Sequence, residues 1–384
     1  MEAIYNIAEI CAKKNVNNVI LSPGSRCAPL TIAFARHPKI KEKTFSDERS
    51  AAFVALGMAQ YTEETVALLC TSGTASLNYA PAITEAYYQH VPLLVLTADR
   101  PPEWIDQRDG QTIRQTNIYQ NHIKGSYDLP VDYAHEDSQW QINRILSEAI
   151  NLSQEDPKGP VHINIPLREP FYPSEEIVFD QNVKVIEKLK ATAKLDASLW
   201  KKLQQEANRY ENILLVAGQE QNNQLRSILL NAQEIPIISD CISNVQSENS
   251  IYLHDIIFSR NNAKNHKKLK PDLLITYGKS VISKNIKLFI RANKPITHWH
   301  IQEVGEVADT YQSLTKIIPV SINEFTQNIA LKSNEYLKKW KEEEAKASIY
   351  QETFFKKAAF GEFKAIHQVL EKIPVKSNLH LANS

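Results

Sequence analysis

The strongest constraint on the fold of this chain is a regular alternation of short apolar runs and longer amphipathic stretches along residues 1–169. Short apolar runs suit buried β-strands, and the amphipathic stretches have helical length. Strands that alternate with helices predict an α/β fold, in which helices cover both faces of a parallel sheet. The expected strands are Val16–Leu21, Lys41–Phe45, Thr65–Cys70, Pro92–Thr97 and Val161–Ile165, and the expected helices run to about Arg36 and over Asp47–Tyr61, Ala75–Gln89 and 138–152.

A polar cluster directly follows each of the first four expected strands. The clusters are Ser22–Arg26, Ser46–Arg49, Thr71–Thr74 and Ala98–Pro102. The carboxyl ends of parallel strands lie along one edge of an open sheet, where ligands bind. We therefore expect the four clusters to meet in one crevice. Taken singly, each cluster also has a purely structural explanation, as a turn or as a helix cap.

Glycine is scarce in this sequence. The chain contains only ten glycines among 384 residues, whereas average usage is about 7%. Where glycine is rare, each one is expected to meet a backbone need, either a positive φ or a close approach of two segments. Gly24, Gly73 and Gly110 all lie inside polar clusters, and we expect each of them to meet such a need.

Length, charge and cysteine usage exclude several classes of function. A chain of 384 residues suggests two or three domains. The 44 basic and 44 acidic residues balance, so no net positive charge favours nucleic acid or an anionic membrane. No apolar run has the length of a membrane span. The four cysteines lie far apart without metal-ligand spacing, which indicates reduced thiols and a cytoplasmic protein.

A second α/β pattern follows the first. Its expected strands are Asn212–Ala217, Pro236–Ser239, Asp272–Tyr277 and Pro295–His300. We divide the chain into a first domain at 1–172, a linker at 173–196, a central domain at 197–345 and a connector with the start of a third domain at 346–384. His298 and His300 alternate on one expected strand. Because no carboxylate or cysteine flanks them at ligand spacing, we expect satisfied or solvated histidines and no metal site.

Several segments together resemble one family of thiamine-diphosphate enzymes, the 2-succinyl-5-enolpyruvyl-6-hydroxy-3-cyclohexene-1-carboxylate (SEPHCHC) synthases of menaquinone biosynthesis. The resemblance runs in order along essentially the whole chain. The matching segments are Leu21–Leu30, Asp47–Ala52, Thr71–Ala82, Pro92–Glu103, Gly110–Gln115 and Gly159–Pro166. The Ser-Pro-Gly-Ser-Arg segment at 22–26 and the Thr-Ala-Asp-Arg-Pro-Pro segment at 97–102 distinguish this family from acetolactate synthases.

The resemblance implies a pyrimidine-binding first domain, a Rossmann-like central domain and a third domain. It implies thiamine diphosphate and Mg²⁺ as cofactors, and isochorismate and 2-oxoglutarate as substrates. In the implied reaction 2-oxoglutarate loses CO₂, and the succinyl carbanion equivalent adds in 1,4 fashion to isochorismate. A homodimer or homotetramer is implied as well. The sequence contains no Gly-x-Gly-x-x-Gly, so nothing favours a dinucleotide site in the central domain.

The resemblance also assigns cofactor-binding residues. Glu48 matches the glutamate that hydrogen-bonds the pyrimidine ring and favours the tautomer that removes the thiazolium proton. Pro23, Thr74 and Asn78 match positions that line the pyrimidine site. The cofactor supplies the carbanion chemistry in such enzymes, and the protein supplies orientation and control of the tautomer.

Both implied substrates are carboxylates, which favours arginine contacts because a guanidinium grips a carboxylate in a bidentate manner. The residues that match substrate contacts are Ser25, Arg26, Arg100, Gln111, Lys284 and Ser384. Gln111 matches a contact near the reacting carbons of the substrate. We therefore predict that Gln111 is a catalytic residue, as Glu48 is. An ion pair of Arg26 with Asp47 or Glu48 is the structural alternative. Lys284 has an equally good explanation as a solvated lysine in the first turn of a helix. The next position, often arginine in the family, is Asn285.

The phosphate-and-metal motif of this cofactor class, Gly-Asp-Gly followed by Asn about thirty residues later, does not occur in the 384 residues. The resemblance places that motif in the third domain, of which residues 378–384 match only the start. We therefore expect no metal ligand in this sequence, weak or no cofactor binding, and no turnover by the chain alone. Alternatives are a non-catalytic truncated paralogue, one subunit of a split enzyme, or another decarboxylase or lyase of the same cofactor class.

Overall fold

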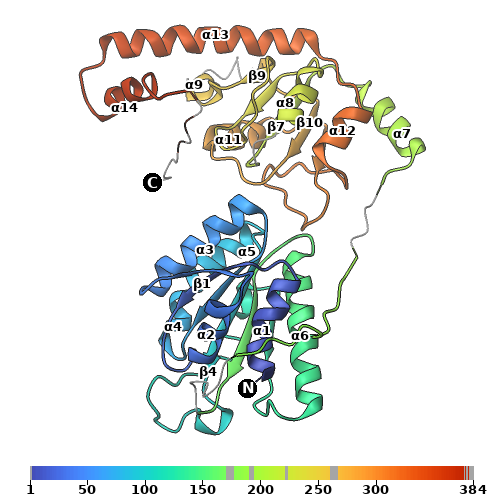
Figure 1. Ribbon diagram of the computed structural model, residues 1–384. Helices are drawn as coiled ribbons and strands as arrows, with labels where there is room; N and C mark the ends of the chain where they lie inside the picture. Colours follow the sequence, from blue (N-terminus) through green and yellow to red (C-terminus); the bar gives the residue numbers. More distant parts are fainter. Residues whose placement is uncertain are drawn as a thin grey trace. The chain divides into compact units, whose positions relative to one another are not determined.

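The computed structural model describes residues 2–169, 177–189, 194–220, 224–259, 267–375, 377 and 379. The chain divides into two compact units, Met1–Ala191 and Thr192–Ser384. Each unit is built on one six-stranded sheet (Figure 1). The predicted α/β class with parallel sheets is confirmed in both units.

All strand pairs of the first sheet are parallel, in the order β2-β1-β3-β4-β6-β5. The strands are β1 (Asn18–Ser22), β2 (Lys41–Thr44), β3 (Val66–Cys70), β4 (Leu93–Asp99), β5 (Gly125–Asp128) and β6 (Val161–Pro166). The five predicted strands all form. The edge strand β5 was not predicted, because its Gly-Ser-Tyr-Asp sequence is polar and short.

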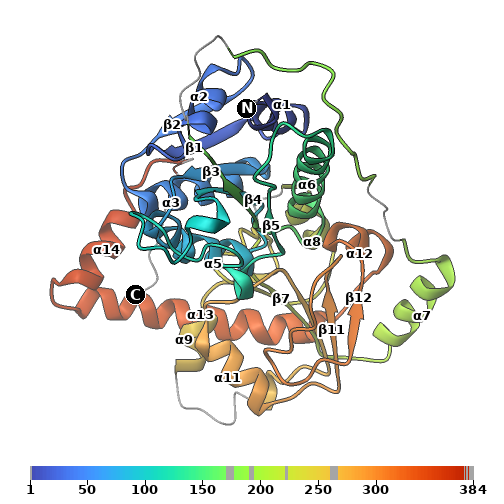
Figure 2. The same cartoon turned by 90° about the horizontal axis from the view of Figure 1, so that it is seen from below.

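Helices cover both faces of this sheet (Figures 1 and 2). One face packs against α1 (Glu2–Lys13), α2 (Ala28–Arg36) and α6 (Glu136–Gln154), and the other against α3 (Glu48–Thr62), α4 (Thr74–Asn78) and α5 (Ala80–Tyr88). Successive strand residues point to opposite faces. In β4, Leu94 and Leu96 therefore join the first core, whereas Leu93 and Val95 join the second.

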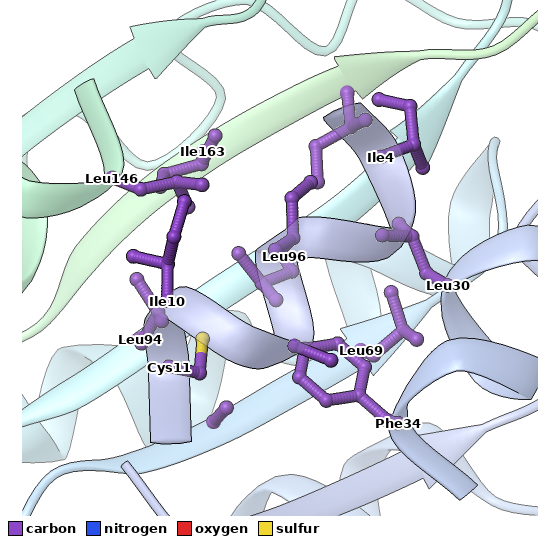
Figure 3. Packing of buried hydrophobic residues seen from close by; sticks show 14 of the residues in the cluster. Ile4, Ile10, Cys11, Leu30, Phe34, Leu69, Leu94, Leu96, Leu146 and Ile163 are labelled. Carbon is purple, nitrogen blue, oxygen red and sulfur yellow. The ribbon is translucent and has the colours of Figure 1, made fainter. Parts of the chain in front are cut away.

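Figure 3 shows the first of these cores from close by. Leu69, Leu94 and Leu96 of the sheet lie among Ile4 and Phe34 of α1 and α2. All five side chains are completely buried. This packing holds α1 and α2 on the sheet and so fixes the turn between β1 and α2.

The helix predicted over Ala75–Gln89 is wrong as a single element. The structure has two helices, and Tyr79 lies between α4 and α5. Pro81 occupies the first turn of α5. A proline ring has no N–H to donate and clashes with the carbonyl group one turn earlier, so it begins a helix and cannot continue one.

The described part of the predicted linker runs along the first unit. Lys13 donates from Nζ to the carbonyl oxygens of Gln181 and Val183, at 2.7 and 3.0 Å, and Lys14 donates to that of Ile186 at 2.8 Å. Val183 is buried in the first core. Residues 177–189 therefore pack on α1 and α6. The predicted domain boundaries themselves stay predictions.

The second sheet is also parallel, in the order β12-β11-β10-β7-β8-β9. Its strands are β7 (Ile213–Ala217), β8 (Ile237–Ser239), β9 (Ser250–Ile251), β10 (Leu273–Tyr277), β11 (Thr297–Ile301) and β12 (Lys316–Ile318). The helices of the second unit are α7 (Ala197–Ala207), α8 (Gln224–Asn231), α9 (His254–Ser259), α11 (Lys284–Ala292), α12 (Ile322–Asn328), α13 (Asn334–Lys357) and α14 (Glu362–Leu370). This strand order is that of the Rossmann fold. The four predicted strands form, and the short edge strands β9 and β12 were not predicted.

The strand order of the second sheet reverses between β7 and β10, where ligands bind in many Rossmann folds. Here the loops after these two strands bond to each other. The Gly218 N–H donates to the Tyr277 carbonyl oxygen at 2.9 Å, and the Lys279 N–H donates to that of Gln219 at 2.9 Å. Gly218 and Gly278 permit this approach, because a Cβ on Gly218 would lie 2.3 Å from the Lys279 carbonyl oxygen.

His298 and His300 both contact the Thr276 hydroxyl, at 2.9 and 2.8 Å, and Ser313 lies 3.1 Å from the other ring nitrogen of His298. Burial lowers the pKa of His298 to about 4. Both rings are therefore satisfied by hydroxyl groups, as predicted. Among the residues that the structure describes, no helix is both long and apolar enough to cross a membrane.

The buried core yields a stability prediction for the first unit. Leu96→Ala removes a side chain that is completely buried in the central strand β4 and should lower the free energy of unfolding by about 2–5 kcal/mol. Urea denaturation followed by circular dichroism measures this change. Leu189→Ala is the matched control, because Leu189 is 88% exposed, and a similar loss in both variants would contradict the assigned core.

A second prediction concerns His162, a completely buried residue of β6. Its Nε2 lies 2.8 Å from Thr97 Oγ1 and its Nδ1 lies 3.2 Å from Ser126 Oγ. Burial lowers the pKa of His162 from 6.5 to about 3. The unfolded chain therefore takes up a proton at this residue before the folded chain does. Stability should fall as the pH drops below 6.5, by up to about 1.4 kcal/mol per pH unit.

Urea titrations between pH 7 and pH 4 measure this effect. His162→Gln should make the dependence of stability on pH shallower, because glutamine does not titrate. His135→Asn is the control, since His135 is exposed and caps α6 and asparagine is a good capping residue. An unchanged pH dependence in His162→Gln would refute this assignment.

Candidate active site at the carboxyl edge of the first sheet

Strand register brings the four polar clusters to one edge of the first sheet. Ser22 at the end of β1 pairs with Cys70 at the end of β3, and Cys70 pairs in turn with Thr97 of β4. On the other side Leu21 pairs with Thr44 of β2. The clusters follow four neighbouring strands, so they lie side by side as expected from the sequence.

Two of the three singled-out glycines permit close contacts at this edge. A Cβ on Gly24 would lie 2.6 Å from Cβ of Thr71, so the turns after β1 and β3 touch. Gly73 has a φ of +88°, and a Cβ there would lie 3.1 Å from the Gln111 carbonyl oxygen. Gly110 has neither feature, since nothing lies within 4 Å of its Cβ position. The prediction is therefore wrong for Gly110.

Glu48 is the first residue of α3. The preceding Asp47 caps the helix, because its Oδ2 accepts a hydrogen bond from the Ser50 N–H at 3.0 Å. This cap fixes the direction in which the helix leaves the edge of the sheet. Glu48 is half-buried. Burial raises the pKa of the Cys70 thiol at the end of β3, and the charge of Glu48 adds to this effect. Within the described residues its carboxylate has no hydrogen-bond or ion-pair partner.

The predicted pyrimidine contacts lie on the surface of the same edge. Thr74 and Asn78 begin and end α4, and residues four apart share one face of a helix. Both side chains are exposed, as are Pro23 and Ser25 in the turn after β1. These residues are therefore accessible to a ligand.

The two predicted substrate arginines differ in their surroundings. Arg26 is buried and donates from Nη1 to the Leu167 carbonyl oxygen at 2.8 Å. Arg100 is half-buried. It lies 2.5 Å from Oδ2 of Asp109 and donates to the Gly110 carbonyl oxygen at 2.5 Å. Arg100 therefore holds the loop that carries Gln111.

From Arg100 to Gln111, this loop contains three residues other than glycine in the left-handed region. Asp106, Arg108 and Gln111 have φ values of 63°, 63° and 55°. Such backbone costs free energy and persists where the surroundings impose it. Here Arg114 pairs with Asp106 at 2.8 Å, and the backbone of Gln111 lies against Gly73. The exposed side chain of Gln111 thereby lies beside the turn that leads to Thr74.

The sequence analysis missed a buried polar network directly beneath these loops. Gln115, which is 1% exposed, accepts a hydrogen bond from the Gly73 N–H at 2.7 Å and donates to the Ala98 carbonyl oxygen at 3.1 Å. It also donates to Oδ1 of Asn164 at 3.0 Å. The available signal was β6, where His162 and Asn164 interrupt an otherwise apolar strand at alternate positions.

Asp99 connects this network to Arg100. Its Oδ2 accepts from Nδ2 of Asn164 at 2.8 Å, and its Oδ1 accepts from the Arg100 N–H at 2.7 Å. Burial raises the pKa of Asp99 to about 6, and the charge of Asp128 adds to this effect, whereas the two hydrogen bonds oppose it. The backbone at Arg100 is thus fixed by a buried carboxyl group.

Two predicted substrate residues do not belong to the described part of the first unit. Lys284 belongs to the second unit, exposed in the first turn of α11. Asp240 fixes that turn, since its Oδ2 accepts from the N–H groups of Ile282 and Ser283 at 2.9 and 3.1 Å. The substrate role of Lys284 stays a prediction. Ser384 lies outside the described residues.

Both buried and accessible polar groups lie at this edge of the sheet. Within the described ranges, no three His, Cys, Asp or Glu side chains are grouped to hold a metal. At the same edge, the buried hydroxyl oxygens of Thr71 and Ser72 have no hydrogen-bond partner among the described residues. Buried polar groups are normally paired. The groups that a ligand can reach at this edge are the exposed side chains of Thr74 and Asn78 and the half-buried carboxylate of Glu48.

Comparisons with known proteins agree with this geometry. Residues 1–123 match the family model of the thiamine pyrophosphate enzyme N-terminal TPP binding domain, and residues 181–381 match the middle domain of thiamine pyrophosphate enzymes. The first match contains the four clusters, Gln111 and Gln115.

Curated relatives cover nearly the whole chain. A protein of Cytophaga hutchinsonii named 2-succinyl-5-enolpyruvyl-6-hydroxy-3-cyclohexene-1-carboxylate synthase is 44% identical over 100% of this chain and 70% of its own length. Proteins of the same name from Flavobacterium johnsoniae and Bacteroides thetaiotaomicron are each 35% identical over 99% of this chain, and over 69% and 68% of their own lengths. The chain belongs to the SEPHCHC synthase family of thiamine-diphosphate enzymes.

Proposed function

We propose that this chain forms the pyrimidine-binding and substrate-binding part of a SEPHCHC synthase. The reaction releases CO₂ from 2-oxoglutarate and transfers the remaining four-carbon unit to isochorismate. The observation that carries the proposal is the half-buried, unpartnered carboxylate of Glu48 at an edge lined by Pro23, Thr74 and Asn78. The family match at 44% identity supports it.

In this proposal each residue of the edge has one task. Thiamine diphosphate, when bound, supplies the chemistry that breaks the carbon–carbon bond of the oxo acid. Glu48 holds a proton between its carboxylate and a ring nitrogen, and Thr74 and Asn78 orient that ring. Arg26 and Arg100 bind substrate carboxylates, while Ser25 and Gln111 contact the reacting part of the substrate.

Mg²⁺, the oligomeric state and the location belong to the same proposal. No Gly-Asp-Gly motif occurs in the sequence, so residues other than these 384 would hold Mg²⁺ and the diphosphate. Phe53 and Tyr61 of α3 are 45% and 90% exposed, which favours a partner surface on this helix. We propose a cytoplasmic homodimer or homotetramer in which Lys284 and Ser384 also contact substrate.

The proposal is tested by joining residues 1–384 to the part of the Cytophaga hutchinsonii relative that this chain does not cover. The joined protein should release CO₂ from 2-oxoglutarate when thiamine diphosphate, Mg²⁺ and isochorismate are present. Glu48→Gln should lower that rate by at least about 100-fold, the range that one group in proton transfer supplies. The 384-residue chain alone should show no turnover.

Glu64→Gln is the matched control, because Glu64 is an exposed glutamate just after α3. It should leave the rate of the joined protein unchanged. Thermal unfolding of each protein checks that it is folded. A folded joined protein with Glu48→Gln at the parent rate would refute the role of Glu48, and turnover by the chain alone would refute the assignment of the metal site to other residues.

A further inference from the structure

We infer that Gln115 is a positioning residue of this site, because its buried amide fixes both the Gly73 turn before Thr74 and the backbone of Arg100. The inference rests on the proposed function for the meaning of the site. The geometric part of the inference depends only on hydrogen bonds within this chain. Gln115 itself is only 1% exposed, so its side chain does not contact a ligand directly.

The orientation of the Gln115 amide is settled by two backbone groups. The Gly73 N–H can only donate, so the atom 2.7 Å from it is Oε1. The Ala98 carbonyl oxygen can only accept, so the atom 3.1 Å from it is Nε2. In a flipped amide, Nε2 would face the Gly73 N–H and Oε1 would face the Ala98 carbonyl oxygen. Neither pair can form a hydrogen bond, so the flipped orientation is excluded.

The orientation of the Gln115 amide also determines the orientation of the Asn164 amide. Because Nε2 of Gln115 donates its second hydrogen to Asn164, the atom of Asn164 that receives it is Oδ1, at 3.0 Å. The Nδ2 group of Asn164 must then face the carboxylates of Asp99 and Asp128, at 2.8 and 3.0 Å. Asp99 in turn accepts the Arg100 N–H. A single sequence of donors and acceptors thus runs from the Gly73 turn to Arg100.

The same ordering fixes the tautomer of His162. Thr97 donates its only hydroxyl hydrogen to Oδ1 of Asn164 at 3.0 Å. The ring nitrogen 2.8 Å from that hydroxyl must therefore carry the hydrogen, so neutral His162 is protonated on Nε2 and accepts from Ser126 on Nδ1. The amide of Gln115 thus fits an order of donors and acceptors that extends to His162.

The segment that begins at Gln111 supports the turn at a second point. The Tyr119 hydroxyl donates to the Ser76 carbonyl oxygen, and the Ser76 hydroxyl donates to the Gly73 carbonyl oxygen at 2.8 Å. Gly73 is thus held on both its N–H and its carbonyl oxygen. Loss of the Gln115 amide would release the N–H side, where φ is +88°.

Amide hydrogen exchange of the 384-residue chain, resolved by residue with NMR, tests the inference. Gln115→Met keeps the length of the side chain but removes its three hydrogen bonds. The exchange of the Gly73 and Arg100 amides should become at least about fivefold faster, the change expected for one lost hydrogen bond. The amides of β1 and α6 should exchange as in the parent. Gln120→Met, at an exposed glutamine of the same segment, should change none of these rates.

Gln115→Asn provides the second variant, because it keeps the amide and its polarity and shortens the side chain by one methylene group. It should show a smaller increase at Gly73 than Gln115→Met. Parent-like exchange at Gly73 in both variants would overturn the inference. A uniform increase throughout the first unit would also overturn it, because that result indicates general stability and not positioning.

Enzyme kinetics of the joined protein test whether Gln115 positions the residues of the site. Gln115→Met should raise the KM for 2-oxoglutarate at least about fivefold, again the effect of one hydrogen bond, and Gln120→Met should not. If Glu48→Gln abolishes turnover while Gln115→Met leaves the KM unchanged, the positioning role fails and the proposed function stands. If the joined protein is inactive, the exchange experiment still decides whether Gln115 holds the Gly73 turn.

Discussion

Parallel pairing of β2, β1, β3 and β4 is the constraint on which the rest of this structure depends. In a parallel sheet every carboxyl end lies on the same edge, so four segments that are far apart in the sequence become neighbours. Burial on both faces stabilises the pairing of β1, β3 and β4, whose residues are almost all buried, whereas β2 is an exposed, polar edge strand. Accessible polar groups such as Glu48 and Thr74 are thereby confined to the edge.

The buried hydrogen-bond network beneath that edge is ordered because it is removed from water. Gln115, Asn164 and His162 are removed from water, where an unmatched donor or acceptor costs free energy. Each of their amides and rings therefore adopts the one orientation that pairs all of its groups. The exposed loop above, with Arg100 and Gln111, is anchored to this ordered layer and takes its conformation from it.

The two units use the carboxyl edge of a parallel sheet differently. In the first unit the loops after β1 and β3 contact each other through Gly24 and Thr71, and Glu48 has no side-chain partner among the residues that the structure describes. In the second unit the loops after β7 and β10 exchange backbone hydrogen bonds, at Gly218 and Lys279. Two parallel six-stranded sheets with different strand orders thus carry an accessible carboxylate at the edge in one unit and a closed backbone junction in the other.

The sequence by itself determined the fold class, the positions of nine strands and the four polar clusters. These features depend on local hydrophobic pattern and turn chemistry, which the order of residues contains. Only the tertiary structure decided the network of Gln115, Asn164 and Asp99, because these residues are distant in sequence and meet through strand register. It also decided that Pro81 divides a predicted helix and that Gly110 lies in open space. Burial and contact arise from the packed whole, so no local pattern contains them.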